Sequence, residues 1–70
     1  MSAELALTVN GKPATAREGS NLAQFAEELG LPPRGVAIAL DGEIVPRSQW
    51  AFTLVTKGCA IEVVSIAAGG

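Results

Sequence analysis

The sequence predicts an α+β fold in which a mixed sheet of about five strands packs on one main helix. Three observations support this prediction: Asn-Gly and Asp-Gly pairs follow short apolar runs, one segment has helical spacing, and the last apolar run is rich in β-branched residues. The 70 residues leave room for a single core. We expect residues 1–66 to form one domain and residues 67–70 to form a flexible carboxyl-terminal tail.

A first hairpin is predicted around Asn10-Gly11. Apolar residues alternate with others over residues 5–9, which is the pattern of a half-buried strand. Both turn residues tolerate the positive φ of a type I′ turn, so the chain should return as a strand over residues 12–16. Because Pro13 has no amide hydrogen for sheet pairing, this second strand belongs at an edge of the sheet.

A helix of about two turns is predicted next. Its apolar positions repeat at helical spacing, at Leu22, Phe25, Ala26 and Leu29. Asn21 and Gln24 have the spacing of a capping box, in which each side chain accepts a hydrogen bond from the other residue's amide. Gly30 suits the left-handed position after the helix, and Pro32-Pro33 prevent the helix from continuing.

The second half of the chain predicts another hairpin and a last strand. Residues 36–40 form an apolar run, an Asp-Gly pair reverses the chain, and residues 43–45 return. Ser48 is expected to cap a single short turn that carries residues 49–52. The final strand is predicted over residues 60–66, where most side chains are β-branched.

Composition excludes several classes of function. The net charge is −2 and the five basic residues are scattered, which argues against a nucleic-acid partner. No segment is apolar enough to span a membrane or act as a signal peptide, so we expect a cytoplasmic protein without a membrane partner. Cys59 is the lone cysteine and there is no histidine, which excludes a Cys/His metal site and the usual nucleophile and base pairs. We therefore predict no catalytic residues, no metal site and no enzyme activity.

The small residues at the end of the chain are the strongest functional candidates: Ala67, Ala68, Gly69 and Gly70. A terminus of small residues is usually a frayed end. The other interpretation is steric, because residues with methyl groups or no Cβ can thread a narrow channel and bring the terminal carboxylate to a nucleotide or nucleophile. Four residues beyond Ile66 reach roughly 13 Å when extended, enough to enter the active site of a partner.

Three other features have a structural and a functional interpretation. In the last strand, Ile61 and Val63 can face the core while Val64 and Ile66 point the other way, so these two are either covered or form a docking patch beside the tail. Cys59 lacks a neighbouring group that activates a thiol, and we interpret it as a small residue between turn and strand. The aromatic side chains of Trp50 and Phe52 are interpreted as core or rim packing.

The chain resembles the ThiS family, the sulfur carriers of thiamin thiazole biosynthesis. The resemblance is carried by the Asn10-Gly11 reversal, the helix NLAQFAEELGL, the segment VAIALDGEIVPRSQW and the terminal AAGG. It covers essentially the whole chain, and VPRSQW together with the terminal Gly-Gly is its specific part. Cys59 is a departure, since many members of the family have aspartate after the glycine of this turn.

The resemblance implies a ubiquitin-like β-grasp fold and a carrier that is a cosubstrate of other enzymes. A ThiF-type enzyme would use ATP to adenylate the carboxylate of Gly70, and sulfur would then convert it to a thiocarboxylate. A ThiG-type thiazole synthase would receive the sulfur, and no cofactor would be bound permanently. Arg47, in the matching VPR segment, would be solvated, or paired with an acidic partner surface or a local carboxylate. It is included with Val64 and Ile66 in the candidate docking surface.

Two alternatives share this fold. A MoaD-like carrier of another pathway has the same terminal chemistry, and only the VPRSQW segment favours ThiS. A noncatalytic ubiquitin-like interaction module, or a modifier joined to lysines, is the alternative from another class; a pure interaction module has no need of the terminal glycines.

Overall fold

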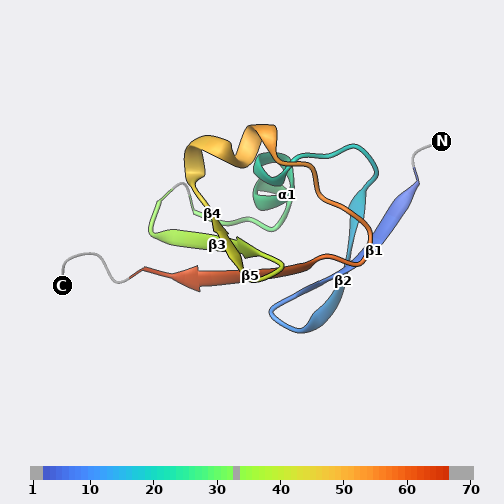
Figure 1. Cartoon of the computed structure of the whole chain (residues 1–70), viewed down its shortest axis with the longest axis horizontal. Helices are drawn as coiled ribbons and strands as arrows, with labels where there is room; N and C mark the ends of the chain where they lie inside the picture. The colour runs from blue at the N-terminus through green and yellow to red at the C-terminus, as the bar shows by residue number, and fades with distance from the viewer. Residues whose placement is uncertain (1–2, 33, 67–70) are drawn as a thin grey trace.

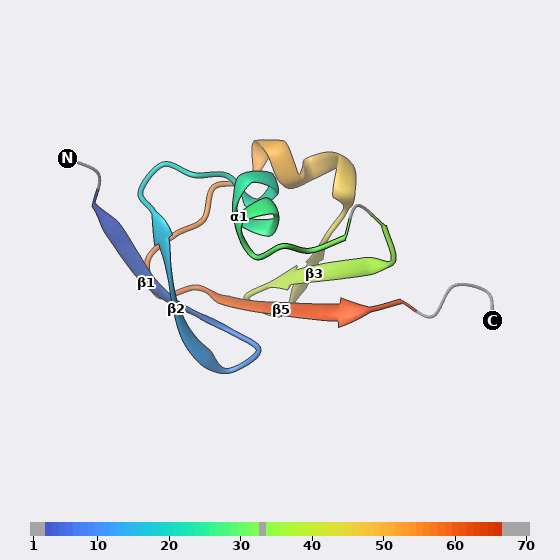
Figure 2. The ribbon, with the colours of Figure 1, turned by 180° about the vertical axis from the view of Figure 1, so that it is seen from behind.

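The five strands form one mixed sheet in the order β2-β1-β5-β3-β4. In this computed structural model, which describes residues 3–32 and 34–66, β5 lies at the centre, parallel to β1 and antiparallel to β3 (Figures 1 and 2). The elements are β1 (Glu4–Val9), β2 (Lys12–Arg17), α1 (Leu22–Glu28), β3 (Val36–Leu40), β4 (Glu43–Val45), the 3₁₀ helix η1 (Arg47–Phe52) and β5 (Ala60–Ser65). The predicted α+β class and the number of strands are confirmed.

Both predicted hairpins are present. Asn10 and Gly11 have φ angles of 52° and 81°, as a type I′ turn requires, and β1 pairs antiparallel with β2 from Val9↔Lys12 onward. β2 is an edge strand. The missing amide hydrogen of Pro13 therefore costs little, and the prediction of an edge position is confirmed.

The helix α1 begins and ends as its sequence predicts. The Oδ1 atom of Asn21 accepts a hydrogen bond of 2.8 Å from the amide of Gln24, and the Oε1 atom of Gln24 accepts one of 2.9 Å from the amide of Asn21. Gly30 has a φ of 75°. The amides of Gly30 and Leu31 donate to the carbonyl oxygens of Glu27 and Ala26, the two bonds of a Schellman motif.

The core lies between one face of the sheet and a layer made of α1 and η1 (Figure 1). Its buried side chains are Leu7, Ala16, Leu22, Phe25, Ala26, Ile38, Trp50, Val55, Cys59 and Ile61. Leu29 was expected on the buried face of the helix but is 38% exposed. The reason is that α1 ends at Glu28 and Leu29 is its cap residue, where the chain already turns away.

The segment after β4 differs from the expected short turn. η1 begins at Arg47, after Pro46, and no side chain caps it, so the prediction that Ser48 caps a turn over residues 49–52 is wrong. Pro46 has a φ of −57°, which pre-orients the chain for a helical turn without a side-chain cap. Trp50 is buried as expected, whereas Phe52, predicted to pack in the core or its rim, is 81% exposed.

Candidate functional site

The carboxyl-terminal strand β5 directs the chain out of the sheet. Ser65 pairs with Val36 at the start of β3, and the amide of Ile66 donates a hydrogen bond of 2.7 Å to the carbonyl oxygen of Gly35. The strand thus ends one residue before the predicted boundary, but Ile66 is still held beside the loop that precedes β3 (Figure 2). The predicted tail residues Ala67, Ala68, Gly69 and Gly70 lie outside the described residues.

The face of the sheet opposite α1 carries exposed apolar side chains. Ile61 is fully buried and Val63 packs against the core, whereas Val64 and Ile66 are each 54% exposed. The prediction that Ile61 and Val63 face the core while Val64 and Ile66 point the other way is therefore confirmed. The exposure of Val64 and Ile66 is what the docking interpretation requires. Docking itself stays a prediction.

Ile44 extends this surface onto the edge strand β4. It is 64% exposed, and its partner in the ladder is Ala39, which in turn pairs with Glu62 of β5. Neighbours in a ladder point to the same side of a sheet, so all three belong to one face. We call this surface the open face and define it by Ala37, Ala39, Ile44, Glu62, Val64 and Ile66.

Sequence reasoning missed Ile44, for which only part of the signal was present. A two-residue turn at Asp41-Gly42 fixes the register of the second hairpin, which places Ile44 opposite Ala39. The side of Ile44 relative to Val64 also depends on the register between β3 and β5, which no local turn fixes.

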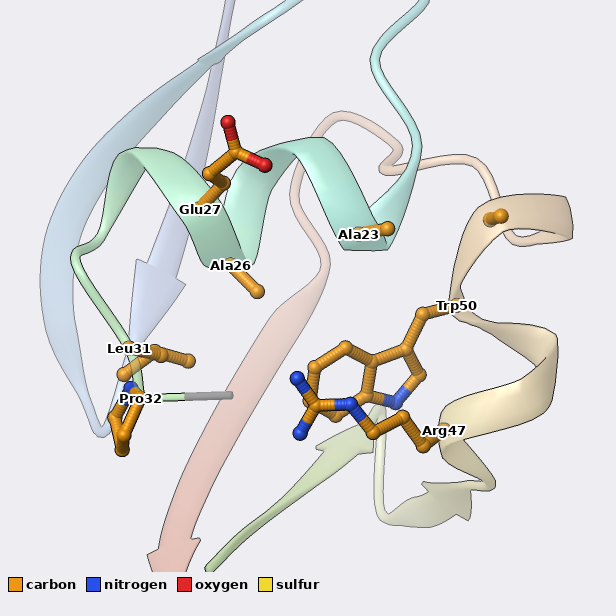
Figure 3. A pocket seen from close by; sticks show the side chains of 8 residues that line it. Ala23, Ala26, Glu27, Leu31, Pro32, Arg47 and Trp50 are labelled. Atoms are coloured by element: carbon orange, nitrogen blue, oxygen red, sulfur yellow. The ribbon is translucent and has the colours of Figure 1, made fainter. Parts of the chain in front are cut away.

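Arg47 does not belong to the open face. Its guanidinium carbon lies 4.5 Å from the centroid of the Trp50 ring, on the side of the sheet that the helical layer covers (Figure 3). Trp50 is itself fixed, because its Nε1 donates a hydrogen bond of 2.9 Å to the carbonyl oxygen of Val45. η1 thus carries Arg47 into the other layer, apart from Val64 and Ile66, and the predicted part of Arg47 in docking stays a prediction.

Arg47 and Trp50 form one wall of a pocket of about 340 Å³ between α1 and η1. The pocket is lined by Ala23, Ala26, Glu27, Leu31, Pro32, Arg47, Trp50 and Ala51. The carboxylate of Glu27 points away from the guanidinium of Arg47 (Figure 3). The described side-chain hydrogen bonds do not involve the guanidinium, so its N–H groups remain available to a carboxylate of a partner.

Cys59 lies far from the point where the chain leaves the sheet. It is 3% exposed and belongs to the core, and it precedes the six-residue strand β5, whereas Ile66 follows it. Burial keeps the thiol from reagents and partners. This position agrees with its interpretation as a small packing residue.

Comparisons with known proteins identify relatives of the whole chain. The model of the ThiS family matches residues 7–70. The sulfur carrier protein ThiS of Escherichia coli strain K12 is 33% identical over 61 residues, which cover 87% of this chain and 92% of that protein. The crystal structure of the thiamine biosynthesis protein ThiS from Geobacter metallireducens has a TM-score of 0.80 at 33% identity, over 94% of this chain and all of that one.

A longer protein also contains a related segment. A thiazole synthase of Paramagnetospirillum magneticum is 33% identical over 64 residues, which are 91% of this chain but only 20% of that protein. Taken with the structural match, these findings confirm the β-grasp prediction and favour the ThiS interpretation over a MoaD-like carrier or a pure interaction module.

Proposed function

Because this chain belongs to the ThiS family of sulfur carriers in thiamin biosynthesis, we propose that the carboxylate of Gly70 is the group that carries the sulfur. A carboxylate is a poor electrophile. Reaction with ATP forms an acyl adenylate and releases pyrophosphate, and attack of hydrosulfide, supplied by the sulfur donor, on the acyl carbon then forms the C–S bond and releases AMP. The product is a thiocarboxylate at Gly70, and the chain is a cosubstrate rather than the catalyst.

The observation that carries the proposal is the path of β5. The strand lies in the middle of the sheet, paired with β1 at its first two residues and with β3 from Ile61 to Ser65, so the sheet sets its direction up to its last residue. Ile66 is the last described residue and is still hydrogen bonded to Gly35. Residues 67–70 carry at most a methyl side chain, and four extended residues reach roughly 13 Å beyond this anchor. That length suffices for the carboxylate to enter an active site while the domain remains outside.

Two enzymes are required as partners. A ThiF-type adenylating enzyme would use ATP, which this chain has no need to bind itself. A thiazole synthase would take the sulfur, and this assignment is supported by the segment related to the whole carrier within a protein named thiazole synthase. We place these reactions in the cytoplasm, where an unpaired thiol such as Cys59 is kept reduced.

We assign docking of these enzymes to the open face. Val64, Ile66 and Ile44 are each more than half exposed, Val64 and Ile66 come directly before the tail in the sequence, and exposed apolar patches on small domains are typical protein contact sites. Arg47 would make a separate contact in the helical layer. Its planar guanidinium is already stacked on Trp50, so little side-chain entropy is lost when it pairs with a carboxylate.

Intact mass spectrometry tests the carrier function directly. The chain is incubated with ATP, a sulfur donor and a ThiF-type enzyme, and we expect a species in which one oxygen is exchanged for sulfur. Deletion of Gly70 should abolish this species while circular dichroism stays unchanged. A chain that lacks Ser2 is the control for loss of one terminal residue and should react normally. Conjugates to lysines of other proteins, or no sulfur at Gly70, would contradict the proposal.

A further inference from the structure

The open face contains one charged side chain. Glu62 pairs with Ala39 of β3, and beyond Ala39 lies Ile44 of β4. Val64 is the next residue of β5 on the same side, so Glu62 adjoins one exposed apolar side chain that we assign to docking and shares a cross-strand row with another, Ile44. Among the described residues of β3, β4 and β5 that point to this face, only Glu62 is charged.

The carboxylate of Glu62 has no partner within the described part of the chain. None of the described side-chain hydrogen bonds involves it. Its neighbours in β3 and along β5 are small or apolar, at Ala37, Ala39, Ala60 and Val64, and on the β1 side the nearby residues are the uncharged Thr8 and Asn10. In the free protein water solvates the carboxylate, because Glu62 is exposed.

Docking of a partner on the open face changes the solvation of this carboxylate. A surface that covers Ile44 and Val64 also comes against Glu62, which precedes Val64 on the same side of β5 and shares a cross-strand row with Ile44. A carboxylate removed from water without a counter-charge is strongly unfavourable, so a purely apolar partner would bind poorly. A cationic side chain at this point offsets the desolvation and fixes the register of the two surfaces.

We propose that the thiazole synthase presents an apolar surface with one lysine or arginine, which pairs with Glu62 when the carrier docks. The inference rests on the proposed function, because it assumes that the open face binds this enzyme. It makes Glu62 a determinant of partner choice, while Ile44 and Val64 supply apolar contact area. An arginine would suit the site best, because its guanidinium binds both oxygens of one carboxylate.

Calorimetric titration of the thiazole synthase with the unmodified carrier tests this pairing. Glu62→Lys should weaken binding at least about 100-fold, because two cations would then face each other, and Glu62→Gln should weaken it about 10-fold. Higher salt should weaken binding of the wild-type chain more than that of Glu62→Gln. Thermal unfolding checks that both variants fold.

Glu43→Lys is the matched control. It makes the same change of charge on β4, two strands from Glu62, but Glu43 pairs with Leu40 and therefore points to the opposite side of the sheet from Ile44. Its affinity should stay within about twofold of wild type.

The inference is overturned if Glu62→Lys binds as tightly as Glu43→Lys, if Glu62→Gln binds more tightly than wild type, or if the wild-type chain does not bind the synthase. These outcomes are distinguishable from failure of the carrier function, which is read separately as sulfur at Gly70 by mass spectrometry. If the wild-type chain folds and acquires sulfur at Gly70 but substitutions at Glu62 do not change binding, the carrier function is supported and only the proposed pairing of Glu62 is refuted.

Discussion

The Oδ1 atom of Asn10 accepts a hydrogen bond of 2.8 Å from the backbone amide of Val63, which lies 53 residues further along the chain. Asp41 does the same for the amide of Ala60, also at 2.8 Å. Both acceptors are the first residues of tight turns and have positive φ, 52° at Asn10 and 51° at Asp41. Each hairpin turn is therefore attached to the strand from which the tail continues.

Substitutions at Asn10 separate the contribution of its side-chain hydrogen bond from that of its tolerance of a positive φ. Asn10→Gly keeps the positive φ accessible but removes the hydrogen bond, and we expect a loss of about 1 kcal/mol in the free energy of unfolding. Asn10→Ala should lose about 1–2 kcal/mol more, because a residue with a Cβ is strained at positive φ. Urea unfolding monitored by Trp50 fluorescence measures both. Equal stability of Asn10→Gly and wild type would show that the bond to Val63 contributes nothing.

Trp50 is expected to hold η1 to the sheet through its indole nitrogen. Trp50→Phe keeps an aromatic ring in the core but leaves the carbonyl oxygen of Val45 without this donor, and we expect a loss of about 1–3 kcal/mol in the free energy of unfolding. Circular dichroism is the suitable probe, because the variant has no tryptophan.

Arg47 should matter much less for stability than Trp50. Arg47 is itself exposed, and cation–π pairs with an exposed cation are worth about 0.5–1 kcal/mol. Arg47→Met keeps the aliphatic stem and removes the charge, so its unfolding free energy should fall by no more than this amount. A larger loss would mean that Arg47 has a structural role that the stacking on Trp50 does not explain.

Local features of the fold were predictable from the sequence. The hairpin turns, the capping box of Asn21 and Gln24, and the edge position of the strand with Pro13 each depend on a few neighbouring residues. The β-grasp arrangement was predicted from the resemblance to a family and not from the periodicity of the sequence. Sequence periodicity alone does not specify the parallel pairing of β1 with β5.

The composition of the candidate site was only partly predictable. The exposure of Val64 and Ile66 follows from alternation along one strand. The separation of Arg47 from them depends on the path of η1, which brings Arg47 against Trp50 in the helical layer. Ile44 joins the site through pairing across β3, a nonlocal relation that requires the register of two ladders.

Cys59 is expected to have no part in sulfur transfer. Because the thiol is buried in the core, Cys59→Ala should leave the rate of thiocarboxylate formation nearly unchanged. Cys59→Ser should also transfer sulfur normally, with a loss of about 1–3 kcal/mol in stability if the new hydroxyl finds no hydrogen-bond partner. Mass spectrometry of the reaction and urea unfolding measure the two effects. A folded variant that no longer accepts sulfur would contradict the structural interpretation of this residue.

Ile44 provides the sharpest test of the apolar part of the open face, because it is the exposed residue on this surface that lies farthest from the tail in the sequence. Ile44→Ala removes contact area without creating a cavity, so the free energy of unfolding should change by no more than about 0.5 kcal/mol. Binding to the thiazole synthase should weaken about 10-fold, the typical cost of truncating a central contact residue.

Phe52→Ala is the control for this truncation. Phe52 is more exposed than Ile44 but lies at the end of η1 in the helical layer, away from the open face. If binding responds to exposed apolar area in general, the larger Phe52 side chain should have the greater effect. If the open face is the docking surface, only Ile44→Ala should weaken binding. Equal loss in both variants would place the contact elsewhere or spread it over both layers.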